Sequence, residues 1–220
     1  QPSTDKWEGY LTGGTGSFNR AEVRGAAGGP IADTLSLRLA ARFEQDDGYT
    51  KDLDPRGSNH IDDSRTRATR GILRLQPSDT VRATLTGDWS DFHGGNTSIR
   101  PNDTLGASRL AGALPTGFHE TRNDIPTFER WNTGGPTLDV DVGLADTIGL
   151  KSITAYKTFD MDFYFNTDGT EIPITRTTET FHTKQFSQEL QLTSRNVERF
   201  TWIAGAYYFH EKKTGALGLG

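Results

Sequence analysis

Several stretches of this chain alternate apolar and polar residues with a period of two. The pattern is clearest over residues 35–43, 81–89 and 138–144, and in the first of these leucines alternate with Arg38 and Arg42. A period of two places successive side chains on opposite faces of a β-strand. The alternation therefore predicts strands with one apolar and one polar face. We expect the apolar face to contact lipid through Leu35, Leu37, Leu39, Phe43, Val81, Leu85, Leu138, Val140 and Val142.

Short and long joints between these stretches also alternate. The short joints fall at residues 32–33, 78–79, 145–146 and 196–197, and the long ones fall around 50–62, 94–130 and 167–182. In an up-and-down membrane barrel the short turns share the periplasmic rim and the long loops share the outer rim. The chain is therefore predicted to be all-β, as an antiparallel up-and-down transmembrane β-barrel. We expect about eight or nine strands, without a helix or a second domain.

The boundaries of the expected strands follow the alternation and the turn residues. The strands run over about 7–15, 20–29, 35–49, 65–75, 81–92, 136–144, 148–166, 184–193 and 200–211. Tyr49, Trp89 and Phe92 fall at long-loop ends, and Trp202 follows a short turn. Aromatic rings concentrate at both membrane–water interfaces of a barrel, so these four are expected in aromatic girdles. Residues 94–130 are expected to form a mobile extracellular loop.

Composition agrees with a membrane barrel better than with a soluble domain. Only 33% of the 220 residues are hydrophobic, and the mean hydropathy is −0.63, although 10% are aromatic. A barrel reconciles these values, because only alternate residues face lipid. The absence of cysteine excludes disulfides and thiolate metal sites. A net charge of −5 without a basic run argues against nucleic-acid binding.

Seven short pieces carry a resemblance to a known family. They are residues 25–31, 35–41, 47–49, 70–79, 150–156, 186–194 and 202–208. Their order and spacing resemble the barrel of TonB-dependent outer-membrane receptors, in the part directly following the plug domain. The resemblance covers essentially the whole chain. It implies that residues 1–220 are a partial receptor barrel domain, with the plug and the remaining strands of a wall of about 22 outside this sequence.

The resemblance also implies a function. Such receptors carry out active transport of a scarce ligand across the Gram-negative outer membrane. Ferric siderophores are their commonest ligand class, with haem, cobalamin and carbohydrate as alternatives. The implied partners are outer-membrane lipid, the protein's own plug domain, the TonB–ExbB–ExbD complex reached through that plug, and a small-molecule or metal-chelate ligand. The residues alone leave two other functions open: a self-contained eight-stranded barrel acting as anchor or pore, and a secreted β-sandwich binding module.

Two groups of residues are candidates for function. Cationic side chains in or beside the long polar segment could attract an anionic chelate, and these ligand candidates are Arg100, Arg109, His119, Arg122 and Arg130. Charged residues on the polar strand faces are expected to contact the plug or line a watery lumen. These are Arg38, Arg42, Arg74, Arg82, Asp88, Asp139 and Asp141.

Other motifs are weaker. Residues 13–16 are glycine-rich but lack the following Gly-Lys-Ser/Thr of a phosphate loop. His93, His119 and Glu120 lack metal-ligand spacing, and the aspartates of residues 46–54 lack the calcium-loop spacing, so solvated loops account for both. No nucleophile with a neighbouring base can be assembled, so neither enzyme activity nor a metal or cofactor is expected.

Overall fold

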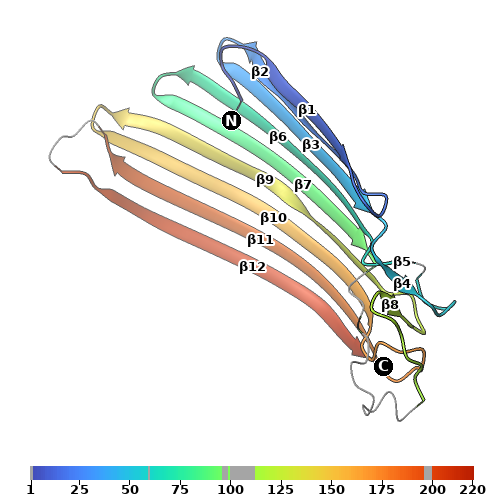
Figure 1. Cartoon of the computed structure of the whole chain (residues 1–220). Coiled ribbons are helices and arrows are strands. Elements are labelled where there is room, and N and C mark those ends of the chain that lie inside the picture. The colour runs from blue at the N-terminus through green and yellow to red at the C-terminus, as the bar shows by residue number, and fades with distance from the viewer. Residues whose placement is uncertain (1, 59, 96–98, 100–111, 196–199) are drawn as a thin grey trace.

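The computed structural model describes residues 2–58, 60–95, 99, 112–195 and 200–220. Nine strands form one antiparallel sheet, and three short strands form a second, small sheet (Figure 1). The large sheet contains β1 (Glu8–Thr15), β2 (Ala21–Ala32), β3 (Leu35–Asp46), β6 (Ser64–Ser78), β7 (Val81–Gly94), β9 (Phe128–Ala145), β10 (Ile148–Asn166), β11 (Arg176–Ser194) and β12 (Ile203–Leu219). The small sheet contains β5 (His60–Ile61), β4 (Thr50–Asp52) and β8 (Glu120–Thr121).

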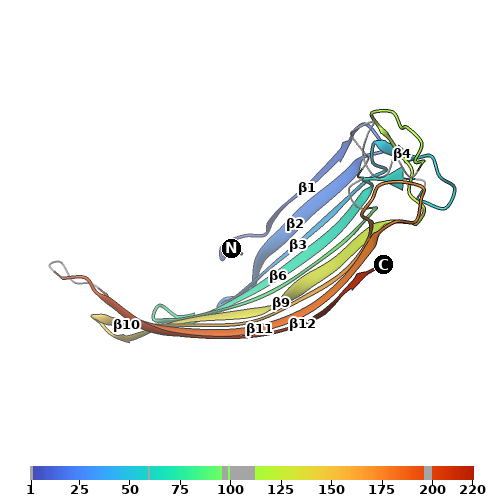
Figure 2. The same cartoon turned by 90° about the horizontal axis from the view of Figure 1, so that it is seen from below.

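The large sheet is a meander in which each strand pairs with its neighbours along the chain. Its order is β1-β2-β3-β6-β7-β9-β10-β11-β12, so β1 and β12 lie at the two edges and do not pair with each other. Figure 2 shows that the sheet is curved across its width. The prediction of an all-β, antiparallel and incomplete barrel wall of eight or nine strands is therefore confirmed.

Short turns and long loops lie at opposite ends of the sheet. Two-residue turns at 33–34, 79–80 and 146–147 connect the strands at one end. Three irregularities in register lie beside these turns, between Pro30 and Ala32, between Leu75 and Ser78, and between Ile148 and Gly149. The small sheet lies at the other end (Figure 1). The alternation of the joints is thus confirmed wherever the structure describes them.

Three strands are longer than their sequence suggested. β11 begins at Arg176 and not near 184, and β12 ends at Leu219 and not near 211. β9 begins at Phe128, whereas the alternation placed its start near 136. Proline lacks a backbone N–H and usually marks a strand end or a bulge. Here Gly135 takes φ of 143°, and the Nζ of Lys157 donates a 2.9 Å hydrogen bond to the Gly135 carbonyl. This local irregularity lets the strand continue through Pro136.

The long segment at 94–130 is more ordered than predicted. Its described part contains β8, which pairs in parallel with β4, and its last three residues belong to β9. The Thr127 hydroxyl, in a residue 4% exposed, donates a 2.6 Å hydrogen bond to the Gly95 carbonyl. The expectation of a loop outside the wall is therefore wrong for residues 128–130, and the mobility of the segment stays a prediction. Within the described residues, the structure holds no helix of the length and apolarity that crossing a membrane requires.

Candidate functional site

Strand register separates the sheet into two chemically different faces. Leu37 pairs with Leu73, Leu73 with Leu85, and Leu85 with Leu138, so leucines from four strands form one row. We call the face that carries this row the apolar face. All nine residues expected to contact lipid lie on it: Leu35, Leu37, Leu39, Phe43, Val81, Leu85, Leu138, Val140 and Val142. Lipid in contact with these nine side chains would therefore meet hydrocarbon.

The opposite face, which we call the polar face, carries the predicted wall residues. Register places Arg38, Arg42, Arg74, Arg82, Asp88, Asp139 and Asp141 together on it. Several are ion-paired across strands. Asp141 accepts from Arg82 at 3.4 Å and from Arg195 at 3.3 Å, and Lys151 lies 3.0 Å from Asp139. Lys157 pairs with Asp88. These pairs join β7, β9 and β10 on the side away from the leucines.

Two groups on the polar face have no partner among the described residues. Arg38 makes no hydrogen bond or ion pair to any of them. The Ser36 hydroxyl also has none, although the residue is only 2% exposed. Ser36 lines a hollow of about 440 Å³ near the short turns, together with Thr4 and Gln76. A buried hydroxyl without a partner is costly, so this end of the face suits a further polar contact.

Aromatic side chains line the polar face nearer the loops. Phe92 stacks on Trp131 with ring centroids 5.4 Å apart, and Trp131 lies 6.5 Å from Phe159. Each ring comes from a different strand, β7, β9 and β10, and we call the three the aromatic row. Phe92 was expected in an outer girdle, and this is wrong because position 92 has the opposite parity to Trp89. Trp89 lies on the apolar face and is 43% exposed.

The sequence missed the aromatic row for a definable reason. Trp131 falls where no strand was expected, so its face could not be assigned. Had β9 been extended back through Pro136, parity alone would have placed Trp131 beside Phe92. A stacked aromatic surface on an otherwise charged wall can bind the flat or apolar part of a ligand.

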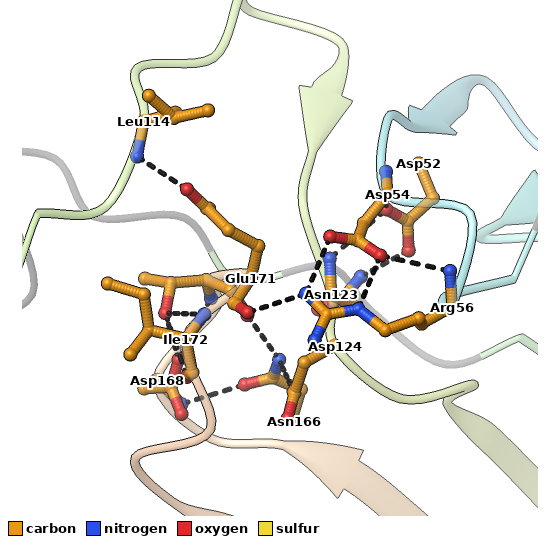
Figure 3. A network of polar contacts seen from close by, with 11 residues as sticks. Asp52, Asp54, Arg56, Leu114, Asn123, Asp124, Asn166, Asp168, Glu171 and Ile172 are labelled. Atoms are coloured by element: carbon orange, nitrogen blue, oxygen red, sulfur yellow. Dashed lines mark hydrogen bonds and ion pairs between the residues drawn. The ribbon is translucent and has the colours of Figure 1, made fainter.

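A polar network connects three loops above the sheet (Figure 3). We call it the loop junction, and its members are Asp52, Asp54, Arg56, Asn123, Asp124, Asn166 and Glu171. The two carboxylate oxygens of Asp52 accept from the backbone N and the Nδ2 of Asn123 at 3.1 and 2.9 Å. Asp52 is 8% exposed and Asn123 is 2% exposed. The end of β4 is thus fixed to the segment between β8 and β9.

Arg56 and Asn166 connect the third loop, which follows β10. The Arg56 guanidinium donates two parallel hydrogen bonds, of 2.9 and 2.8 Å, to the Asp54 carboxylate. It also donates a hydrogen bond of 2.8 Å to the Glu171 carbonyl. The Nδ2 of Asn166, in a residue 1% exposed, donates to Asp124 at 2.9 Å. The Oε1 of Glu171 accepts from the Leu114 backbone N at 2.8 Å. The three loops therefore hold one another in place.

Two carboxylates of the loop junction titrate abnormally, in opposite directions. The fork of hydrogen bonds from Arg56 lowers the pKa of Asp54 to about 2. Burial, followed by the nearby charge of Asp168, raises the pKa of Asp124 above its usual range. Asp54 is thus held charged and Asp124 is biased toward its neutral form.

The predicted ligand residues are not all together. His119 and Arg122 flank β8, and the His119 ring lies edge-on to Tyr49 at 5.6 Å. Arg130 lies within β9 opposite His93, on the apolar face, so its assignment to a loop is wrong. Arg100 and Arg109 lie outside the described residues. The ligand-binding role of these side chains remains a prediction.

Comparisons with known proteins were made by sequence and by structure. No protein-family model matches the sequence, and no curated protein sequence matches it. Among solved structures, the chain resembles the ferric yersiniabactin uptake receptor FyuA from Yersinia pestis over its whole length, with a TM-score of 0.82 and 18% identity. It resembles FpvAI, solved in complex with pyocin S2, over 99% of its length, with a TM-score of 0.75 and 14% identity.

A third similar structure is the siderophore receptor PiuA from Acinetobacter baumannii, matched over 96% of the chain with a TM-score of 0.67 and 15% identity. The chain covers 33%, 30% and 31% of FyuA, FpvAI and PiuA, respectively. FyuA is described as an uptake receptor and PiuA as a siderophore receptor. Within the described residues, no three His, Asp or Glu side chains are grouped as a metal site requires. The chain therefore has the fold of a siderophore-receptor barrel wall and spans about a third of the length of the structures it matches.

Proposed function

We propose that this chain is part of the barrel of an outer-membrane uptake receptor in a Gram-negative cell. The observation that carries the proposal is the two-faced meander, whose whole length matches siderophore receptors with a TM-score of up to 0.82. An open nine-stranded sheet with one apolar face can exist in lipid only if further strands complete its edges. Residues 1–220 are accordingly proposed to be a partial barrel domain of a longer receptor.

The proposed ligand is a ferric siderophore. Its uptake is proposed to be driven by the TonB complex, acting through a plug domain. The aromatic row and the loop junction are the proposed contact regions, because both lie at the loop end of the sheet. Arg38 and Ser36, without partners on the polar face, are proposed to contact the plug, and Arg42, Arg74, Arg82, Asp88, Asp139 and Asp141 to line the lumen around it.

The two alternative functions fit the structure less well. A self-contained small barrel requires its first and last strands to pair, but β1 and β12 each have a single partner strand in the described sheet. A β-sandwich requires a second sheet facing the apolar side. The small sheet of β4, β5 and β8 lies instead at the loop end (Figure 1).

Uptake in cells tests the proposal. We expect a strain lacking the gene that contains this chain to lose accumulation of one iron-labelled siderophore under iron limitation, and the full gene to restore it. Deletion of TonB should abolish uptake while leaving surface binding intact, since binding itself needs no energy. Trp131→Ala should weaken binding, whereas Trp89→Ala, on the other face, should not. Uptake unchanged by loss of the gene for every siderophore supplied would contradict the proposal.

A further inference from the structure

Toward the loop end of the sheet, the apolar face carries cationic side chains in place of apolar ones. Along β7 this face carries Val81 to Trp89 and then changes to Asp91 and His93. Nine residues are about the length that a tilted strand needs to cross the hydrocarbon core of a bilayer. Trp89 therefore lies at the upper edge of that core. His93 lies above it, at the level of the lipid headgroups.

The strands on both sides of β7 add arginines at the same level. Arg65 of β6 pairs with His93, and His93 pairs with Arg130 of β9, so the three side chains form a row on three neighbouring strands. Arg67 lies two residues below this row on β6. Lys184 of β11 lies directly opposite Lys212 of β12, and this pair lines up with Trp89, four residues below the row. We call Arg65, Arg67, Arg130, Lys184 and Lys212 the cationic belt, and all five are exposed.

The cationic belt forms no ion pairs with the described part of the protein around it. None of its five members forms an ion pair with a residue that the structure describes. Asp162 pairs with Arg130 in the strand register, but the guanidinium lies instead over the Phe128 ring, 4.6 Å from its centroid. Asp91 is opposite Arg67 without forming an ion pair. The third aspartate of this face, Asp160, accepts from His182 at 2.8 Å.

A bound anion would stabilise this arrangement. Lys184 and Lys212 are like charges directly opposite each other, and such a pair destabilises its two strands. Additional strands at the sheet edges cannot supply the counter-charge for Arg65 and Arg130, because β6 and β9 already have both neighbours in the sheet. Arginine also matches the geometry of phosphate with two parallel hydrogen bonds.

We propose that the cationic belt binds the phosphate groups of lipid headgroups in the outer leaflet. This inference rests on the proposed membrane location but not on the identity of the transported ligand. The belt lies on the face away from the aromatic row, so lipid and ligand would bind on opposite sides of the wall. Its function is to fix the height and orientation of the barrel in the membrane.

The test uses the full receptor that contains this chain, purified in a neutral detergent. Binding of phosphatidic acid, whose headgroup is a bare phosphate, is measured by native mass spectrometry beside phosphatidylcholine. The wild-type protein should bind phosphatidic acid in preference. Arg65→Gln with Arg130→Gln should lower that affinity about fivefold for each arginine removed, the factor that one cationic side chain contributes near an anionic lipid surface.

Three controls make the result decisive. Arg38→Gln with Arg70→Gln removes equal charge from the polar face and should leave phosphatidic acid binding unchanged. Arg65→Lys with Arg130→Lys keeps the charge and should retain most of the binding, which separates loss of charge from misfolding. Inorganic phosphate should compete weakly, because it lacks acyl chains that pack on the apolar band.

Three outcomes would overturn the proposal. The first is an unchanged affinity of the Arg65/Arg130 glutamine variant, and the second is an equal loss in the Arg38/Arg70 variant. The third is full competition by inorganic phosphate, which would indicate a site for a free anion. Siderophore uptake is measured in a separate assay. A failure to transport would therefore refute the proposed function without altering the lipid result.

Discussion

Leu85 shows how much depends on the parity of a single position. It lies in the leucine row of the apolar face, whereas Thr86, its neighbour along β7, lies on the polar face. We expect Leu85→Arg to lower the stability of the folded receptor by about 2–4 kcal/mol, the cost of arginine near the midplane of a lipid-facing barrel surface. Reversible unfolding in lipid vesicles measures this cost. Thr86→Arg is the matched control and should cost far less; equal costs would show that the faces are wrongly assigned.

The loop junction should respond to acid through Asp54. Its pKa is lowered to about 2 from 3.8, so its ion pair with Arg56 contributes full stability above about pH 4 and loses it as the pH falls toward 2. We expect the backbone N–H groups of Asn123 and Gly57 to lose protection against hydrogen exchange over this interval, measured relative to the intrinsic exchange rate at each pH.

Two variants isolate the carboxylates of the loop junction. Asp54→Asn removes the acid-dependent step and should exchange faster already at neutral pH. Asp124 acts in the opposite sense, because its pKa is raised: its charged form is disfavoured in the folded state, and the penalty disappears as the pH falls. Asp124→Asn should therefore not weaken the junction at pH 7. Protection factors in the wild type that stay constant from pH 5 to pH 2.5 would contradict this account of Asp54.

At the scale of elements, the position of the loops can be tested on intact cells. The described part of 95–127 includes β8 and members of the loop junction, at the end of the sheet opposite the two-residue turns. Added protease should cleave the full receptor within 95–127 and spare the turns at 33–34, 79–80 and 146–147. Cleavage of those turns in intact cells, or of 95–127 only after the outer membrane is permeabilised, would reverse the orientation. Arg56→Ala should accelerate cleavage, because the loops lose their shared donor.

The strands differ in how far their sequence could predict them. β10 was predicted over its whole length, 148–166, because regular side-chain alternation and turn residues agree there. The predicted β9 was eight residues too short, because Gly134, Gly135 and Pro136 indicate a break in a strand. Only the tertiary contact from Lys157 shows that the strand continues. The faces of the charged wall residues could be predicted from the parity of their positions. The loop junction could not be predicted, because the hydrogen bonds that connect its loops join residues more than 40 positions apart, such as Asn166 and Asp124.

At the scale of the whole molecule, the two open edges determine how the segment should behave alone. β1 and β12 each leave one side without backbone partners in the described sheet, and unpaired edges cause aggregation or insertion failure in lipid. We expect residues 1–220 expressed alone to form no closed barrel and to transport nothing. Refolding in detergent followed by gel mobility with and without heating tests this. A monodisperse, heat-modifiable monomer would contradict the partial-barrel proposal and favour the small-barrel alternative. Co-expression with the rest of the receptor should restore a folded species.

Strand length changes steadily across the sheet, and this gives the barrel an uneven height. β1 has 8 residues, whereas β10 and β11 each have 19. A tilted strand needs about 9–11 residues to cross a bilayer, so β1 barely spans it. Through the strand pairing, Thr15 at the end of β1 lines up with Asp162 of β10, so β10 extends only four residues beyond β1 at the loop end, and its other extra residues lie at the end with the short turns. Trp131 lines up with Gly14, so a ligand must pass below the rim, even at β1, before it reaches the aromatic row.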